Sequence, residues 1–154
     1  LMIANGVPRV VEFNCRFGDP EAQVVLPLLK SDLVDLLVAS ATGTLGQLAV
    51  DVDVDGACVC VVLASKGYPG PYEKGLEIHG LDWFDGRDDA FAFHAGTTLD
   101  GDRLVTAGGR VLGITATGAD ISAAVENAYE AVKQVSFEGA YWRRDIAHRA
   151  LSRL

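Results

Sequence analysis

The sequence of 154 residues contains little cysteine, and this limits the classes of protein it can belong to. Its three cysteines are Cys15, Cys58 and Cys60, an odd and sparse set that does not form a disulfide framework. Cys58 and Cys60 would share one face of a strand, where neighbours two residues apart are poorly placed to bridge. We therefore expect reduced thiols in a cytoplasmic protein, and no cysteine–histidine group has zinc spacing.

Long apolar runs and positive charge are also scarce. No stretch approaches the roughly 20 apolar residues of a membrane-spanning helix, so no membrane partner is expected. The formal net charge of −8 argues against non-specific binding to nucleic acid, although it leaves room for a local basic site that binds a small anion. The first residues, Leu1-Met2-Ile3, lack the features of a signal peptide and resemble a strand already under way. We interpret this start as a truncation.

What is present favours a folded core. Hydrophobic residues make up 49% of the chain and charged residues 22%, which argues against disorder. The length suits one ordinary domain, or one small domain together with a fragment of another.

The first 43 residues predict short strands followed by two helices. Asn5-Gly6 is a dipeptide favoured in tight hairpin turns. Asp19 suits a helix N-cap that is followed by proline at the first helical position. The expected elements are strands at 1–4 and 8–14, a helix from Asp19, and a helix from Ser31 that ends at Gly43.

The pattern changes after residue 56 to several strands followed by one long helix. Residues 57–65 are a dense β-branched run suited to a buried strand. Asp120 is placed to cap a helix whose apolar stripe continues to Val135. Strands followed by a helix indicate an α+β fold with a mainly antiparallel sheet. The other expected elements are strands near 77–79 and at 90–97, 103–106 and 110–117, and a terminal helix at 144–154.

The polar connector at about residues 44–56 is the expected domain boundary, with one part at 1–48 and a small α+β domain at 49–154. The run from Asp51 to Gly56 matches the opening of a calcium loop. The twelfth position of that loop should be glutamate, but it is Val62, inside the hydrophobic strand. We interpret the run as a solvated linker.

Glu12 and Asn14 are the first candidate site residues. On a strand they would share one face, and their oxygens suit a hard cation such as magnesium. The plain alternative is a solvated strand face. Arg16 follows within two residues and could hold a carboxylate or phosphate through two parallel hydrogen bonds, or form an ordinary salt bridge.

These residues carry a resemblance to a known family. The run from Glu12 to Gln23, EFNCRFGDPEAQ, closely resembles the signature of phosphoribosylamine–glycine ligase, an ATP-grasp enzyme of purine biosynthesis. Further similar segments follow in the family's order and cover nearly all of the chain. They are SKGYPG at 65–70, FHAGT at 93–97, GGRVL at 108–112 and YWRRDI at 141–146.

The resemblance implies an end of an ATP-grasp domain followed by a C-terminal α+β domain. It implies a ligase that joins glycine to 5-phosphoribosylamine and cleaves ATP to ADP and phosphate. The glycine carboxylate would attack the γ-phosphate to give glycyl phosphate, and the amine would then displace phosphate. Cosubstrate ATP and a magnesium (or manganese) ion are implied, as is contact with the remainder of the parent chain.

The resemblance also suggests roles for individual residues. Glu12 and Asn14 would bind the metal, and Arg16 would stabilise charge at the transferring phosphoryl group or the glycine carboxylate. Asp19 would either bind the amine substrate or simply cap the helix.

Two glycine-containing turns lie beside cations, Lys66 to Gly70 with Tyr68, and Gly108-Gly109-Arg110. Backbone amides at glycines can approach an anion closely, so we expect Lys66, Tyr68, Gly109 and Arg110 to help hold the ribose 5-phosphate. The alternative is two hairpin turns with exposed cations. His94 is given no catalytic role.

The chain lacks the N-terminal domain, the glycine-rich lid and the nucleotide-binding lysines of the family, so we expect the fragment alone to be inactive. Two alternatives stay open. One is another ATP-grasp carboxylate–amine ligase or carboxylase, and the other is a binding or scaffold module that kept the fold and lost the chemistry.

Overall fold

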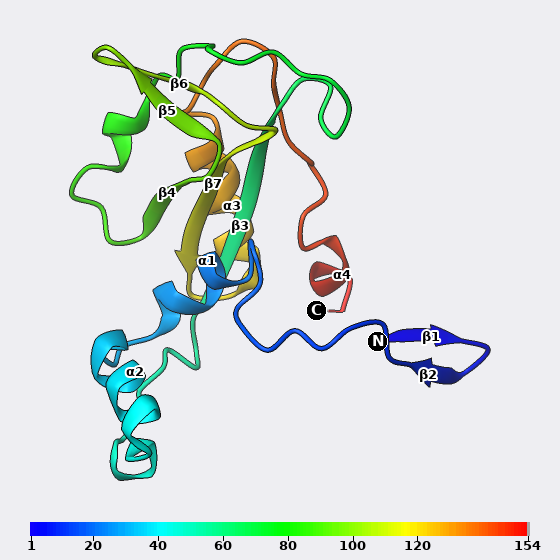
Figure 1. The fold of residues 1–154 in the computed structure, drawn as a ribbon, viewed down its shortest axis with the longest axis vertical. Helices are drawn as coiled ribbons and strands as arrows, with labels where there is room; N and C mark the ends of the chain where they lie inside the picture. The colour runs from blue at the N-terminus through cyan, green and yellow to red at the C-terminus, as the bar shows by residue number, and fades with distance from the viewer. Residues whose placement is uncertain (154) are drawn as a thin grey trace.

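Four antiparallel strands form the central sheet in the computed structural model, which describes residues 1–153 (Figure 1). The strand order is β4-β7-β3-β8. The α+β fold with a mainly antiparallel sheet is therefore confirmed. The strands are β3 (Ala57–Ser65), β4 (Ala90–His94), β7 (Arg110–Gly118) and β8 (Ala140–Tyr141).

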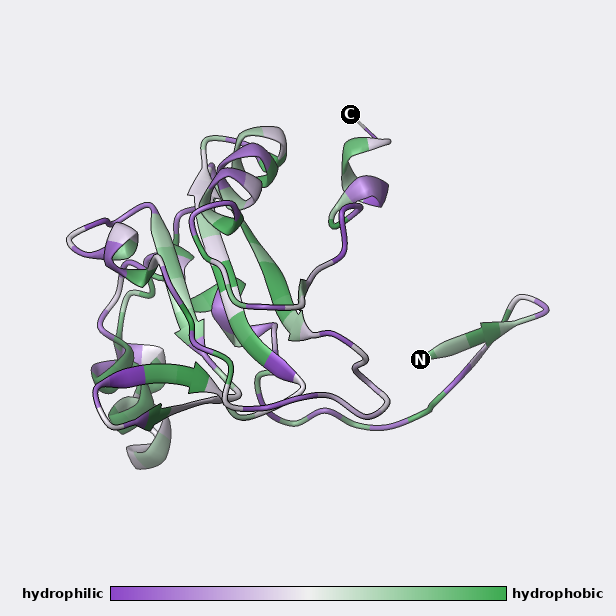
Figure 2. Cartoon of the chain, turned by 90° about the horizontal axis from the view of Figure 1, so that it is seen from above, coloured by the Kyte–Doolittle hydropathy of each residue, from purple (hydrophilic) through white to green (hydrophobic). Residues whose placement is uncertain are grey.

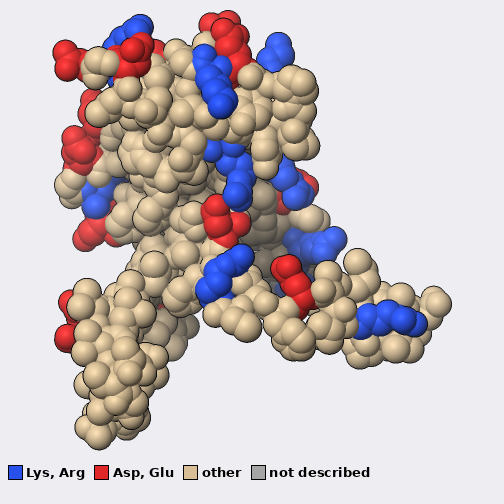
Figure 3. All heavy atoms as spheres, viewed as in Figure 1, with Lys and Arg blue, Asp and Glu red and all other residues tan. Residues whose placement is uncertain are grey.

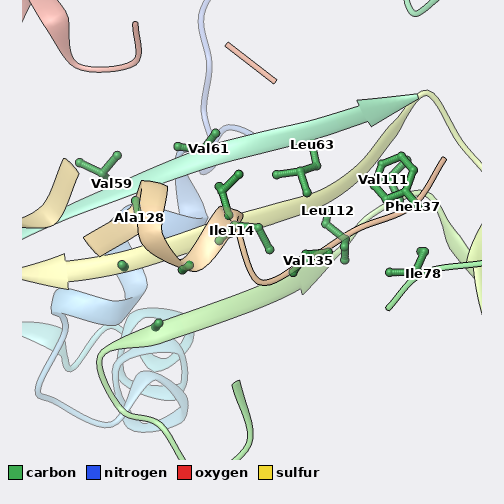
Figure 4. Close-up of a cluster of buried hydrophobic side chains, with 14 of the residues drawn as sticks. Val59, Val61, Leu63, Ile78, Val111, Leu112, Ile114, Ala128, Val135 and Phe137 are labelled. Carbon is green, nitrogen blue, oxygen red and sulfur yellow. The ribbon is translucent and has the colours of Figure 1, made fainter. Parts of the chain in front are cut away.

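The main hydrophobic core lies between this sheet and helix α3 (Ile121–Val132). Alternate residues of β3, among them Val59, Val61 and Leu63, are almost fully buried in one cluster with Ala128 of the helix (Figure 4). Asp120 caps α3 as expected, because its Oδ1 accepts a hydrogen bond from the amide of Ala123 at 2.8 Å.

Helix α1 (Ala22–Val25) lies against β3 and β7 on the sheet face opposite α3 (Figure 1). The expectation that Asp19 caps this helix is wrong. The helix begins three residues later, its N-cap is Glu21 without a side-chain cap, and the Asp19 carboxylate contacts Arg110 and Gln23 instead. The short helix η1 (Leu26–Leu28) follows directly.

The N-cap of helix α2 (Leu33–Thr42) is Asp32, one residue after Ser31, from which the helix was expected to start. Asp32 accepts hydrogen bonds from the amides of Val34 and Asp35, whereas the hydroxyl of Ser31 accepts from the amide of Asp51 at 2.7 Å. Gly43 ends the helix in a left-handed conformation, as expected. The connector then contains the short helix η2 (Leu45–Gln47).

The N-terminal arm is a hairpin of β1 (Met2–Ala4) and β2 (Val7–Arg9) that extends away from the sheet (Figures 1 and 2). Asn5 and Gly6 both have positive φ, so the expected turn is confirmed. The second strand was expected to reach residue 14, but it stops at Arg9. Arg9 pairs with Met2, and residues 10–14 that follow have no regular secondary structure.

Two strand predictions beyond β3 are also wrong. The expected strand at 90–97 is divided into β4 and β5 (Thr97–Asp100), which pairs with β6 (Arg103–Thr106) in a separate hairpin. The break occurs where the backbone of Gly96 passes so close to Gly108 that a Cβ on Gly96 would lie 2.6 Å from the Gly108 Cα. Residues 77–79 form only isolated bridges, to Val105 and Ser136, next to the short helix η3 (Leu81–Phe84).

The C-terminal segment contains a short helix, α4 (His148–Leu151), instead of the expected helix at 144–154, and Leu154 lies outside the described residues. Tyr129 of α3 holds this segment: its hydroxyl donates to the carbonyl of Arg143 at 2.8 Å and accepts from the amide of Ile146 at 3.1 Å. Val135 lies beyond the end of α3 but is still buried. None of the helices in residues 1–153 combines the length and apolar character that crossing a membrane requires.

Candidate functional site

Glu12 and Asn14 lie in an exposed segment without regular structure, so they do not share a strand face as expected. Arg16 is close to this segment. Its Nη1 donates to Asn14 Oδ1 at 2.6 Å and to the carbonyl of Phe17 at 3.3 Å. One oxygen of the expected metal pair is therefore engaged by a guanidinium group, while Glu12 offers an exposed carboxylate.

Asp19 and Arg110 join two parts of the chain that are 91 residues apart. Arg110 Nη2 lies 3.0 Å from Asp19 Oδ2, and its Nη1 donates to the Asp19 carbonyl at 3.4 Å. The other carboxylate oxygen of Asp19 accepts from Gln23 Nε2 at 2.9 Å. This contact places the segment around residues 16–23 beside the start of β7.

A bulge in the pairing of β3 with β7 accounts for the direction of Arg110. Leu63 pairs with Leu112 and Ala64 with Arg110, so Val111 is the extra residue. Val111 and Leu112 are consecutive, yet both are buried in the core cluster with α3. Regular alternation would have turned Arg110 toward α3, and the bulge turns it toward Asp19 on the other face.

Tyr68 and Gly109 lie together beside Arg110. A Cβ on Gly109 would lie 2.1 Å from Cδ2 of the Tyr68 ring, so only glycine permits this packing. Ser65 fixes the same turn, because its amide donates to the carbonyl of Gly109 at 2.8 Å and its hydroxyl to that of Gly108 at 3.0 Å. The two expected turns are thus brought into one cluster.

Lys66 follows Ser65 but faces different neighbours. It lines a cavity of about 190 Å³ with two carboxylates, Glu73 and Glu138. The structure therefore gives Lys66 no direct link to Arg110, and its expected contact with phosphate stays a prediction. His94 is exposed, and its Nδ1 lies 3.0 Å from the hydroxyl of Thr97.

The cysteines Cys58 and Cys60 lie on the α1 face of β3, where they help line an apolar hollow of about 450 Å³. Burial raises the pKa of the Cys58 thiol to about 11 and also raises the pKa of the Cys60 thiol. Thiols with raised pKa values carry little thiolate near neutral pH, so they are poor nucleophiles and poor metal ligands. All three cysteines are free.

Charged side chains of both signs are interspersed on the face seen in Figure 3, while much of α2 is uncharged and the hairpin of the N-terminal arm carries Arg9 on β2. Within residues 1–153, no three His, Cys, Asp or Glu side chains converge to hold a metal ion. Glu12 and Asn14 include only one residue of those four types. In the connector, Asp53 forms an ion pair with Lys30 at 3.3 Å.

Sequence reasoning missed two residues of this cluster, Gln23 and Ser65. Both belong to segments that were singled out, the run at 12–23 and the turn at 65–70, but neither was given a role. Their partners Asp19 and Gly109 are 4 and 44 residues away, and the second separation gives no local signal. The bulge at Val111 was missed for the same reason.

Comparison with known proteins adds a second line of evidence. The family described as "Phosphoribosylglycinamide synthetase, C domain" matches residues 58–149, more than half of the chain. The phosphoribosylamine–glycine ligase of Chlorobaculum tepidum is 51% identical over 151 residues, which cover 98% of this chain and 35% of that protein. The trifunctional purine biosynthetic protein adenosine-3 of Gallus gallus is 46% identical over 153 residues, covering 99% of this chain and 15% of that protein.

A solved structure is similar as well. The crystal structure of phosphoribosylamine–glycine ligase from Thermotoga maritima matches with a TM-score of 0.70 and 36% sequence identity, over 94% of this chain and 34% of that one. The chain thus spans about a third of the length of the ligases it matches.

Proposed function

The chain belongs to the phosphoribosylamine–glycine ligase family, and we propose that it forms one wall of the active site of an ATP-dependent ligase that joins glycine to 5-phosphoribosylamine. The observation that carries this proposal is the contact between Asp19 and Arg110. It brings the signature segment at 12–23 beside the glycine turn of the C-terminal sheet, so that candidate groups for both substrates lie near one another. The family relationship favours this reaction over that of another ATP-grasp ligase.

In the proposed reaction, a carboxylate oxygen of glycine attacks the γ-phosphorus of ATP and ADP leaves. The nitrogen of phosphoribosylamine then attacks the carbonyl carbon of glycyl phosphate, and phosphate leaves as the carbon–nitrogen bond forms. Arg16 is exposed and near the expected metal ligands, so we assign it the stabilisation of negative charge at the phosphoryl group or the glycine carboxylate.

Glu12 and Asn14 would hold magnesium or manganese. Their donor set fits, because a carboxylate oxygen and an amide oxygen suit a hard cation. Such an ion, when bound with ATP, neutralises phosphate charge. Arg16 donates to the same amide oxygen of Asn14, so its guanidinium group lies beside the residues that would hold the ion.

Arg110, Gly109, Tyr68 and Lys66 would hold the ribose 5-phosphate, with Asp19 near the amine. A guanidinium group carries five N–H donors, and Asp19 engages only part of them. The remaining donors of Arg110 are available to an anion, and its side chain is 43% exposed. Lys66 would add charge from the neighbouring turn.

The remainder of the parent chain is the proposed partner of the arm. Residues 1–48 would complete an ATP-grasp domain, and residues 49–154 would form the C-terminal domain. Among the described residues, Ala39 is the only buried hydrophobic residue before the sheet, whereas Leu1 and Phe13 are 82% and 83% exposed. Apolar side chains exposed on this scale mark a surface that another part of a protein covers. Three free thiols favour a cytoplasmic location.

The first test is an assay of the full-length ligase beside this chain alone. We expect ADP release by the full-length protein only when glycine and phosphoribosylamine are both present, and none by residues 1–154, because they carry one wall of the site. A folded full-length protein without this activity would favour the scaffold alternative.

Glu12→Ala tests the metal assignment in the full-length ligase. Loss of one of two protein ligands should raise the magnesium concentration required for half-maximal rate by roughly 10- to 100-fold. Magnesium titrations of the rate measure this, with Glu126→Ala, an exposed carboxylate on α3, as the matched control. An unchanged magnesium requirement would show that Glu12 is not a ligand.

Arg110→Ala tests the phosphate assignment. Loss of charged hydrogen bonds worth about 1.5–3 kcal/mol should raise the KM for phosphoribosylamine roughly 10- to 100-fold and leave the KM for ATP nearly unchanged. Arg103→Ala is the matched control, since it removes a similar exposed ion pair with Asp100. Equal changes in both KM values would rule out a specific phosphate contact.

A further inference from the structure

Within the described part of the chain, the nitrogen of the side-chain amide of Gln23 on α1 has a hydrogen-bond partner and the oxygen has none. Its Nε2 donates to Asp19 Oδ1 at 2.9 Å. Its Oε1 is buried and has no hydrogen-bond partner among residues 1–153. The orientation of the amide follows from chemistry, because the opposite orientation would place a carbonyl oxygen against a carboxylate oxygen.

Stability does not explain a glutamine at this position. A buried carbonyl oxygen without a partner costs free energy, and an apolar side chain of the same shape would avoid that cost. The side chain lies over the sheet, where its Cγ would be in ordinary van der Waals contact, at 3.9 Å, with a Cβ placed on Gly113 of β7. What glutamine provides and methionine would not is the N–H donor directed at Asp19.

The hydrogen bond from Gln23 and the ion pair with Arg110 engage different oxygens of the Asp19 carboxylate. Gln23 occupies Oδ1, and Oδ2 is left to face Arg110 Nη2 at 3.0 Å. The Asp19 side chain is 54% exposed, so packing alone does not fix its rotation. The three side chains form a continuous chain of contacts from α1 to the first residue of β7.

We propose that Gln23 is a positioning residue for the phosphoribosylamine site. It fixes the carboxylate of Asp19, and the carboxylate in turn holds the guanidinium group of Arg110 in the direction of the substrate. This inference rests on the proposed function, because it assigns a purpose to the link between Asp19 and Arg110.

Gln23→Met in the full-length ligase tests this role. The change keeps the length and volume of the side chain, removes the donor and removes the unpartnered oxygen. We expect the KM for phosphoribosylamine to rise about three- to tenfold, the range of one lost hydrogen bond. The KM for ATP and the midpoint of thermal unfolding should both stay close to the values of the unmodified ligase. Gln47→Met, at an exposed position of η2, is the matched control and should change neither quantity.

A lowered unfolding midpoint with an unchanged KM for phosphoribosylamine would overturn the inference, because it would show a structural role only. Gln23→Glu provides a second variant that keeps the shape but cannot donate to Asp19 when ionised, and it should raise the same KM. If Arg110→Ala raises this KM but both Gln23 variants leave it unchanged, the positioning role fails and the proposed function stands. If Arg110→Ala itself has no effect, the phosphate assignment fails first.

Discussion

The pairing of β3 with β7 contains one irregularity on which the candidate site depends. An extra residue at Val111 lets two consecutive side chains, Val111 and Leu112, enter the core beneath α3. The extra residue shifts the alternation of side chains by one residue before the bulge. The side chain of Arg110 therefore points to the opposite face of the sheet, toward Asp19. The same end of the sheet holds Gly109 beneath the ring of Tyr68. Burial of apolar side chains on the α3 face of the sheet thus fixes the direction of Arg110 on the other face. The bulge is the feature that connects the hydrophobic core to the candidate site.

The ion pair between Asp19 and Arg110 contributes little to stability by itself. Both side chains are about half exposed, and exposed ion pairs are typically worth about 0–1 kcal/mol because water and salt screen them. Its importance is geometric. It is the charged contact between the signature segment and the sheet, and Gln23 supports it at the cost of a buried, unpartnered oxygen. An arrangement that sacrifices stability in this way is expected at functional sites.

Local patterns predicted the fold well where the signal was local. The strand at 57–65, the Asn5-Gly6 turn, the Asp120 cap and the Gly43 helix end were all confirmed. The predictions that failed depended on distant partners. Asp19 is followed by proline, which is typical of a helix N-cap, but its carboxylate contacts Arg110, 91 positions away. The strand at 90–97 breaks at Gly96 because the backbone of Gly108 approaches it. The candidate residues were named from a family signature, while their grouping around Arg110 required the bulge, which no local pattern reveals.

The most direct test of this account is a double-mutant cycle on Asp19 and Arg110 in the full-length ligase, with kcat/KM for phosphoribosylamine as the observable. The variants are Asp19→Asn, Arg110→Ala and the two combined. If the carboxylate acts by holding the guanidinium group, the effects should be non-additive by at least about 1 kcal/mol, roughly a fivefold difference in kcat/KM. Effects that add within about 0.5 kcal/mol would show that the two residues act independently and would contradict the account.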